Sequence, residues 1–495
     1  MTQIKKGAIL SYVSIFLTNV VGLFLTPFII KSLGNSEYGL YSLIGSLVAY
    51  LTLMDFGLNN TIVRFVSKYQ AEKDTEGEKS FLGTVMTIYF VISFLLISLG
   101  IVFYFNIEVF FKNSLLPTQI EDAKTMFLIL LFDIGIALPS GSFLAICTAY
   151  GQFVFPKLIT ILRYVLRSAA VVGVLLLGGK SISIVVIDTV FNILVVSVAF
   201  YYCIYSLKVK FSFKERSKAI IREIFSYSIW IFIAVMINTF QWNAGQIILG
   251  FYFKTEVIAV FAVGLMLGGY FGAFSGVINT LLLPKAAQML SENVSSIVLT
   301  DTMIRVGRMN SFISFLILSG FVVLGKEFVF LWVGSSYAAS WTIALLIMLS
   351  SIVPLTQSFG ISILEIKNKV KYKSLGVLLS MTIAIIVSFI LGKQYGIYGV
   401  ILPIVMGGVV STIINNVLFV TVFDFKILKF FKETFFFQTI YSAFFVFVFL
   451  LLKDYFLITT WFTFIVAGII FSFLFFLFYY LLLFNKEEKA LLWRR

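Results

Sequence analysis

The sequence predicts an all-α integral membrane protein whose chain crosses the bilayer fourteen times. Three observations predict this class: the composition, a series of apolar runs of membrane-spanning length, and the alternation of basic residues between those runs. Of the 495 residues, 60% are hydrophobic and only 12% are charged, with a mean hydropathy of +1.04. Soluble domains carry about twice that share of charge. The bilayer is therefore the expected solvent.

Fourteen runs along the chain are long and apolar enough to cross the membrane. A spanning helix needs roughly 20 mostly apolar residues. Helices are expected because lipid offers no hydrogen-bond partner to an open backbone. The predicted spans are 9–30, 38–60, 81–104, 126–147, 158–178, 182–205, 224–250, 257–283, 311–333, 340–363, 375–391, 398–422, 435–452 and 460–484.

The basic residues between these runs fix the count and the orientation. With the N-terminus placed in the cytoplasm, 27 Lys and Arg fall in cytoplasmic segments and 8 in external segments, and two lie inside a span. Such an excess is what the positive-inside rule requires. A missed or added helix would reverse the alternation after it, and no such reversal occurs. Both termini are therefore predicted to be cytoplasmic, in a multi-pass protein of the plasma membrane.

The spans divide into two similar halves followed by an appendix. An offset of 219 residues aligns a mid-helix amide, an acidic residue in the first external turn and a glycine in the following helix: Asn19 with Asn238, Glu37 with Glu256, and Gly45 with Gly264. Internal repeats of this kind are common in transporters. The predicted organisation is an N-terminal six-helix lobe at 1–206, a basic cytoplasmic linker at 207–222, a C-terminal six-helix lobe at 223–423, and helices thirteen and fourteen with a tail at 424–495. The equal entry direction of the halves implies a pseudo-twofold axis along the membrane normal.

Signals of catalysis are missing from the sequence. The chain has no His, which excludes His-based zinc sites and His general bases. It has no Gly-rich phosphate loop with a lysine. Cys147 and Cys203 lie in apolar stretches and form no CxxC motif. We therefore expect neither an enzyme nor a bound cofactor or metal.

The net charge of +14 does not indicate a nucleic-acid partner, because the basic residues fall in short loops where they orient the spans. The linker charges are also compatible with anionic membrane lipids.

Ionisable residues within spans are costly and mark candidate functional sites. Arg163 and Arg167 lie four residues apart on one face of the fifth span. Two guanidinium groups near mid-membrane suit a phosphate or diphosphate, which arginine binds bidentately. Alternatively Arg167 is neutralised by Asp133, which lies at a similar depth in the fourth span. A pair that opens when substrate arrives would do both.

Further residues in or near the spans are candidates for gating, coupling or substrate contact. Asp188, in the sixth span, has no obvious partner and could carry a coupling proton or face an aqueous cavity. Asp55 is either a functional group or a helix-end cap paired locally with Arg64. The seventh span carries an amide stripe that could bind sugar hydroxyls or join helices. Its members are Asn238, Gln241, Asn243 and Gln246.

The opening of the chain resembles a known family. The residues that carry the resemblance are Asn19 to Pro27, the stretch Leu33-Gly34-Asn35-Ser36-Glu37-Tyr38-Gly39-Leu40-Tyr41, and Asp55-Phe56-Gly57-Leu58 leading to Arg64-Phe65-Val66. They are similar to the polysaccharide-biosynthesis membrane proteins, the O-antigen and capsule repeat-unit flippases of the multidrug/oligosaccharidyl-lipid/polysaccharide exporter superfamily. The likeness is sharp over roughly the first 80 residues and says little about which glycan is handled.

The resemblance implies two six-helix bundles that form a V around a central cavity and work by alternating access. It implies an undecaprenyl-diphosphate-linked glycan as substrate, moved to the outer face of the bacterial inner membrane for lipopolysaccharide or capsule assembly. A polysaccharide polymerase is a further candidate partner. Arg163 and Arg167 fit the cationic cavities of the family by position and type, although no motif fixes them residue by residue. Many repeat-unit flippases have twelve helices rather than fourteen.

Three other interpretations stay open. A cation-coupled small-molecule antiporter of the same superfamily would need an excess of acidic cavity residues, whereas the deep charges here are mixed. A membrane-embedded polymerase is disfavoured by short external loops. A peptidoglycan-precursor flippase is a close variant of the main interpretation.

Overall fold

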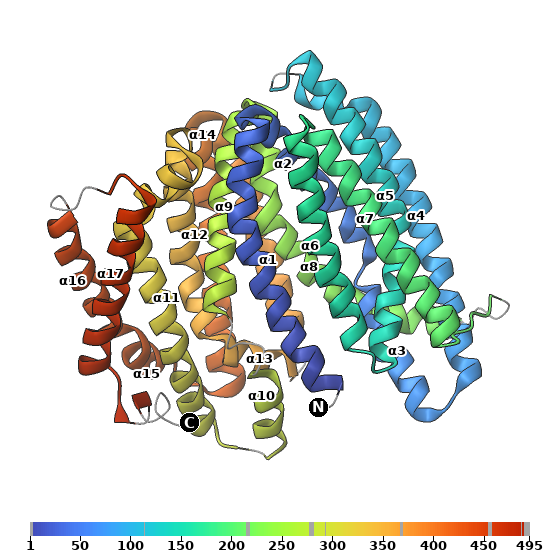
Figure 1. Cartoon of the computed structure of the whole chain (residues 1–495). Helices are drawn as coiled ribbons and strands as arrows, with labels where there is room; N and C mark the ends of the chain where they lie inside the picture. The colour runs from blue at the N-terminus through green and yellow to red at the C-terminus, as the bar shows by residue number, and fades with distance from the viewer. Residues whose placement is uncertain are drawn as a thin grey trace. The chain divides into compact units, whose positions relative to one another are not determined.

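The computed structural model consists of helices throughout the described residues, which are 3–112, 114–213, 218–276, 282–292, 294–366, 370–453, 458–486 and 488–489. The chain forms two compact units (Figure 1). The first contains 1–259 and 389–400, and the second contains 260–388 and 401–495. Residues 214–217 of the predicted linker lie outside the described residues.

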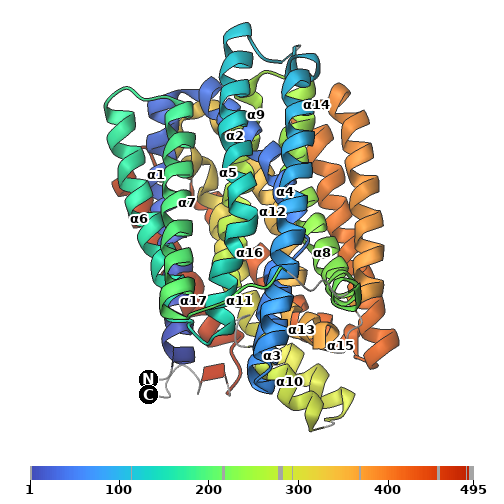
Figure 2. The ribbon, with the colours of Figure 1, turned by 90° about the vertical axis from the view of Figure 1, so that its right-hand side faces the viewer.

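The first unit is built from the N-terminal helices. Its elements are α1 (Gln3–Leu33), α2 (Asn35–Leu51), η1 (Thr52–Asp55), α3 (Leu58–Glu72), α4 (Thr75–Phe111), α5 (Pro117–Ala149), α6 (Val154–Leu176), α7 (Ser181–Tyr201), η2 (Tyr202–Ser206), α8 (Lys218–Tyr252) and the start of α9 (Thr255–Ser275). The helix α1 packs along α6, α2 packs along α8, and α5 lies between α4 and α7, as Figure 2 shows for α5 and its neighbours.

The second unit is centred on one long helix, α11 (Ser296–Val333), against which α12 (Ala338–Thr356), α16 (Phe437–Lys453) and α17 (Trp461–Leu482) pack. The rest of the unit comprises most of α9, then α10 (Leu282–Ser291), η4 (Ser335–Tyr337), α13 (Ser358–Ile366), most of α14 (Val370–Phe423), α15 (Ile427–Phe431) and η5 (Lys432–Phe436).

The prediction of an all-α protein with many membrane-spanning helices is confirmed. Among the described residues, 13 helical segments are long and apolar enough to span a membrane. One of them, α14, has 54 residues and would be about 80 Å long if straight, more than twice the hydrocarbon thickness. Gly396 interrupts it with φ 60° and ψ −138°, a conformation open essentially to glycine alone. This break falls between the predicted spans 375–391 and 398–422, so α14 contains two of the fourteen predicted spans.

A second break divides the predicted span 38–60. The α2 helix passes through η1 into Phe56 and Gly57, which both have positive φ (50° and 70°), before α3 begins. Since side chains with a Cβ rarely adopt that region, the break is a defined local structure rather than a fraying end. It places the polar residues around Asp55 at a fixed kink.

The two contact units do not coincide with the two predicted lobes, because α8 belongs to the first unit. The lobes are a proposal about internal symmetry, and local geometry supports it. Glu37 lies in the first turn of α2, and Glu256, its partner at the offset of 219, lies in the first turn of α9. An acidic residue at each position offsets the positive end of its helix dipole.

Candidate functional site

A bidentate ion pair lies inside the spanning helices of the first unit. Arg167 on α6 donates from Nε to Oδ1 of Asp188 at 2.5 Å and from Nη2 to Oδ2 at 2.9 Å. The Tyr41 hydroxyl on α2 lies 3.5 Å from both Asp188 Oδ2 and Arg167 Nη2. Such fork-to-carboxylate geometry is among the strongest polar contacts available to a protein.

This pairing differs from the one the sequence suggested. Asp188, which had no obvious partner, is the partner of Arg167, and Asp133 instead accepts a 2.7 Å hydrogen bond from the Asn192 amide. The depth of a residue along its helix can be counted from sequence, and by depth Asp133 and Arg167 match. The rotation of each helix about its own axis cannot be derived from the sequence in this way. In the structure, that rotation places Asp188 next to Arg167.

Arg163 is the remaining ionised group of the cluster. It is half-buried one turn from Arg167, and Asp133 is close enough to interact with its charge. Within the described residues no hydrogen bond or ion pair holds its guanidinium. Two arginines and two aspartates make the cluster formally neutral. Arg167 is held in an ion pair with Asp188, whereas the Arg163 guanidinium can still accept a ligand as a hydrogen-bond donor.

The positions around the α2–α3 kink form a separate polar group. Asp55 Oδ1 accepts hydrogen bonds from the Tyr89 hydroxyl at 2.8 Å and from the Asn59 amide at 3.1 Å, which joins η1 to α3 and α4. Arg64 is exposed, with its guanidinium carbon 5.7 Å from the ring centre of Phe65. This arrangement supports the interpretation of Asp55 as a residue that fixes the kink.

The amide stripe on α8 is only partly engaged. Asn243 donates from Nδ2 to the Thr239 carbonyl of its own helix at 3.4 Å. Gln241 is half-buried and Asn238 is exposed, and neither has a hydrogen bond among the described residues. The stripe is therefore not joined to a neighbouring helix through these side chains, which leaves the sugar-binding interpretation open.

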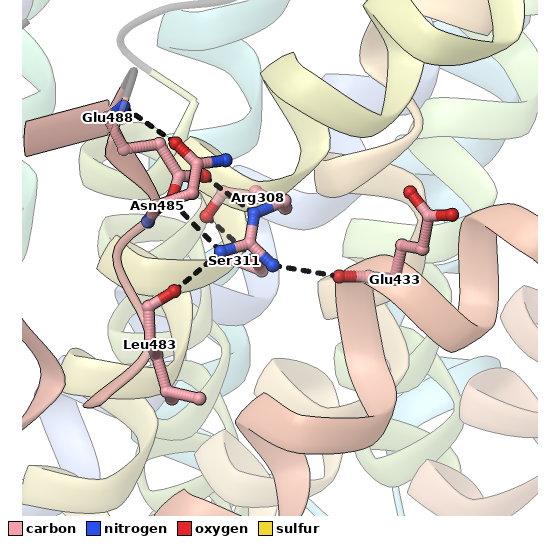
Figure 3. Close-up of polar contacts among 6 residues, drawn as sticks. All are labelled: Arg308, Ser311, Glu433, Leu483, Asn485 and Glu488. Carbon is pink, nitrogen blue, oxygen red and sulfur yellow. Dashed lines mark hydrogen bonds and ion pairs between the residues drawn. The ribbon is translucent and has the colours of Figure 1, made fainter.

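A third polar network, which was not predicted from the sequence, lies in the second unit. Figure 3 shows Arg308 of α11 between the chain that follows α17 and Glu433 of η5, the segment that leads into α16. Arg308 donates to both carboxylate oxygens of Glu488 (2.6 and 2.9 Å), to the Leu483 carbonyl (2.8 Å) and to the Glu433 carbonyl (3.0 Å). Asn485 and Glu488 also bond reciprocally to each other's backbone N–H at 2.8 Å. By sequence Arg308 was one more orienting charge.

The comparison with protein families decides where this chain belongs. The model described as "Polysaccharide biosynthesis protein" matches residues 4–290, more than half of the chain. The chain belongs to this polysaccharide biosynthesis family. The match extends well beyond the opening 80 residues and contains the Arg163–Arg167 cluster and the α8 amides. No curated protein sequence matches.

Solved structures with the same fold include several transporters. A structure described as the lipid II flippase MurJ in an inward closed conformation has a TM-score of 0.70 at 21% identity, covering 96% of this chain and all of that one. The eukaryotic MATE transporter AtDTX14 has a TM-score of 0.55 at 13% identity, over 85% of this chain and 96% of its own. A MOP superfamily transporter from Pyrococcus furiosus has a TM-score of 0.53 at 12% identity, over 85% and 94%. This member of the polysaccharide biosynthesis family therefore has a transporter fold and is a multi-pass membrane protein.

Proposed function

We propose that this protein translocates an undecaprenyl-diphosphate-linked oligosaccharide from the cytoplasmic to the outer leaflet of the bacterial inner membrane, for surface polysaccharide assembly. The observation that carries the proposal is the half-buried, unpaired Arg163 beside the Arg167–Asp188 pair, within spanning helices of the family-matched region. Arg163 is the first contact for a diphosphate, and the α8 amides Asn238, Gln241 and Asn243 are contacts for sugar hydroxyls.

The physical task fits these residues. A diphosphate and a chain of sugars cannot enter hydrocarbon unaided, because their polar groups would lose their hydrogen bonds to water. An arginine supplies planar, two-pronged donation to phosphate oxygens, and amides can both donate to and accept from hydroxyls. The prenyl chain can stay in lipid throughout.

The Arg167–Asp188 pair is proposed to be the coupling element. A carboxylate that exchanges an arginine for a proton would release Arg167 to the substrate. Asp133 and Asn192 lie next to it and would adjust to that exchange, whereas Asp55 and Arg64 are assigned to the kink rather than to coupling.

Depletion of the protein from its host should remove surface polysaccharide while lipid-linked oligosaccharide accumulates. Expression of the Arg163→Ala variant at the wild-type level should not restore the polysaccharide. Full restoration by that variant would remove Arg163 from the site, and unchanged polysaccharide on depletion would reject the function.

A second candidate is a peptidoglycan-precursor flippase, favoured by the likeness to the lipid II flippase over 96% of this chain. The two are separated by complementation. Rescue of a strain depleted of its lipid II flippase would favour the second candidate, and failure to rescue, together with loss of surface polysaccharide on depletion, would favour the first.

A further inference from the structure

Three polar side chains meet at the end of the first unit that is remote from the N-terminus. The hydroxyls of Ser36 at the start of α2 and Thr255 at the start of α9 lie 3.0 Å apart. The Gln119 amide at the start of α5 donates from Nε2 to Ser36 Oγ at 2.7 Å and to Thr255 Oγ1 at 3.3 Å. We refer to Ser36, Gln119 and Thr255 as the polar latch.

The amide of Gln119 is held in the orientation that closes the latch. Its Oε1 accepts a hydrogen bond from the backbone N–H of Leu116 at 3.0 Å, so its Nε2 must face the two hydroxyls. Thr255 is only 1% exposed. Ser36 and Gln119 are half-buried, so the latch is a satisfied, partly buried network in which the hydrogen bonds strengthen one another.

Ser36 and Thr255 are also related by the repeat. They are separated by 219 residues, the offset that aligns Glu37 with Glu256 and Asn19 with Asn238. Two residues related by a twofold axis can touch each other only if they lie close to that axis. The contact therefore marks the point where equivalent parts of the two proposed lobes meet.

Two neighbouring contacts show how closely the backbones approach here. A Cβ added to Gly39 of α2 would overlap the carbonyl of Thr255. The Ser114 hydroxyl, in the turn before α5, donates to the carbonyl of Gly250 near the end of α8. The helix ends of the two proposed lobes therefore approach each other closely near the latch.

We infer that the polar latch closes the translocation path at the outer end of the helices and has to open once in every transport cycle. This inference rests on the proposed function, because a two-lobe transporter that releases cargo outside must separate equivalent helix ends there. Since the latch joins its lobes through hydrogen bonds and a glycine contact, without an ion pair between its three members, it can break at modest cost.

The first test locks the latch. Cys147 and Cys203 are replaced by serine, and Ser36→Cys and Thr255→Cys are introduced together. Oxidation should join the two cysteines, as counted by maleimide-polymer labelling after denaturation, and polysaccharide export should stop and then return with dithiothreitol. The two single-cysteine variants should export normally in oxidant. Export at the unoxidised rate by the cross-linked protein would overturn the inference.

The second test does not depend on the glycan. In the same background, Thr255→Cys is exposed to a membrane-impermeant maleimide added outside intact cells. Adding Gln119→Ala, which removes the two hydrogen bonds to the latch hydroxyls, should raise the labelling rate by roughly five- to tenfold. The matched control is Ser181→Cys at the same end of the unit, where Ser181 is 0% exposed and hydrogen-bonded at 3.1 Å to Glu37 of its own lobe.

The outcomes distinguish a failure of the polar latch from a failure of the proposed function. Faster labelling at position 255 with no change at 181 supports the latch even if the cargo is not the proposed glycan. Equal labelling of Thr255→Cys with and without Gln119→Ala would overturn the latch and leave the proposed function standing.

Discussion

At the scale of the residue, the two arginines of α6 have different tasks although they lie on one helical face. Arg167 is bound bidentately by Asp188, and Arg163 has no hydrogen bond or ion pair among the described residues. The sequence identified both, and the four-residue spacing was enough for that. It could not assign their partners, because the rotation of α5 and α7 about their axes decides whether Asp133 or Asp188 meets Arg167.

Arg163→Ala should reduce polysaccharide export by at least about tenfold, because a charge-assisted contact to the diphosphate is lost while no structural pair is broken. Membrane levels of the protein should be unchanged. Arg163→Lys keeps the charge and loses the planar fork, so an intermediate rate is expected. Normal export by Arg163→Ala at normal protein level would contradict the assignment.

Asp188→Asn should lower stability, since it leaves the Arg167 guanidinium in the membrane without its carboxylate. Breaking a buried pair costs about 3–5 kcal/mol, whereas replacing both partners costs less. The double variant Arg167→Leu/Asp188→Leu should therefore unfold at a higher temperature in detergent than Asp188→Asn, although it should not transport. A double variant less stable than the single one would show that the pair stabilises the fold more than this account allows.

At the scale of the element, the ranges of the spanning helices could be predicted from the sequence, whereas several contacts between helices could not. Apolar length and the alternation of basic residues gave fourteen crossings, including the two that α14 carries on either side of Gly396. The polar network of Arg308 was not foreseen, because an arginine near a helix end looks like an orienting charge wherever it lies. Its partner Glu488 is 180 residues away, in the short tail that follows the last predicted span.

The Arg308 network fastens the last two helices. The helices α16 and α17 each pack on α11, and aromatic pairs such as Tyr441–Phe475 and Phe445–Phe471, with ring centres 5.1 and 5.3 Å apart, fill the space between them. One guanidinium then binds α11 to η5, which leads into α16, and to the chain after α17. The network thus sets the position of the pair that lies outside the proposed repeat.

Arg308→Ala should lower the free energy of unfolding by about 3 kcal/mol, because Glu488 is left buried without its partner. The matched control is Lys426→Ala, whose ion pair with Asp424 has side chains 54% and 74% exposed and should contribute about 0–1 kcal/mol. Thermal unfolding in detergent compares the two. Equal losses in both variants would show that the Arg308 network does not fasten the C-terminal helices.

At the scale of the whole molecule, the sequence predicted the family and the transporter class from composition, basic alternation and an opening motif, and the family match over 4–290 confirms the family. The repeat offset of 219 was proposed from isolated alignments. It stays a prediction, and the structure adds that two residues at this offset, Ser36 and Thr255, are hydrogen-bonded to each other.

The central claim is that the protein moves a lipid-linked oligosaccharide from the cytoplasmic to the outer leaflet. The most direct measurement is the sidedness of lipid-linked oligosaccharide in cells depleted of this protein, read by its accessibility to a membrane-impermeant sugar-modifying reagent and identified by mass. Accumulation in the protected, cytoplasmic leaflet is the predicted result. Lipid-linked oligosaccharide that reaches the outer leaflet at the normal rate without the protein would contradict the account.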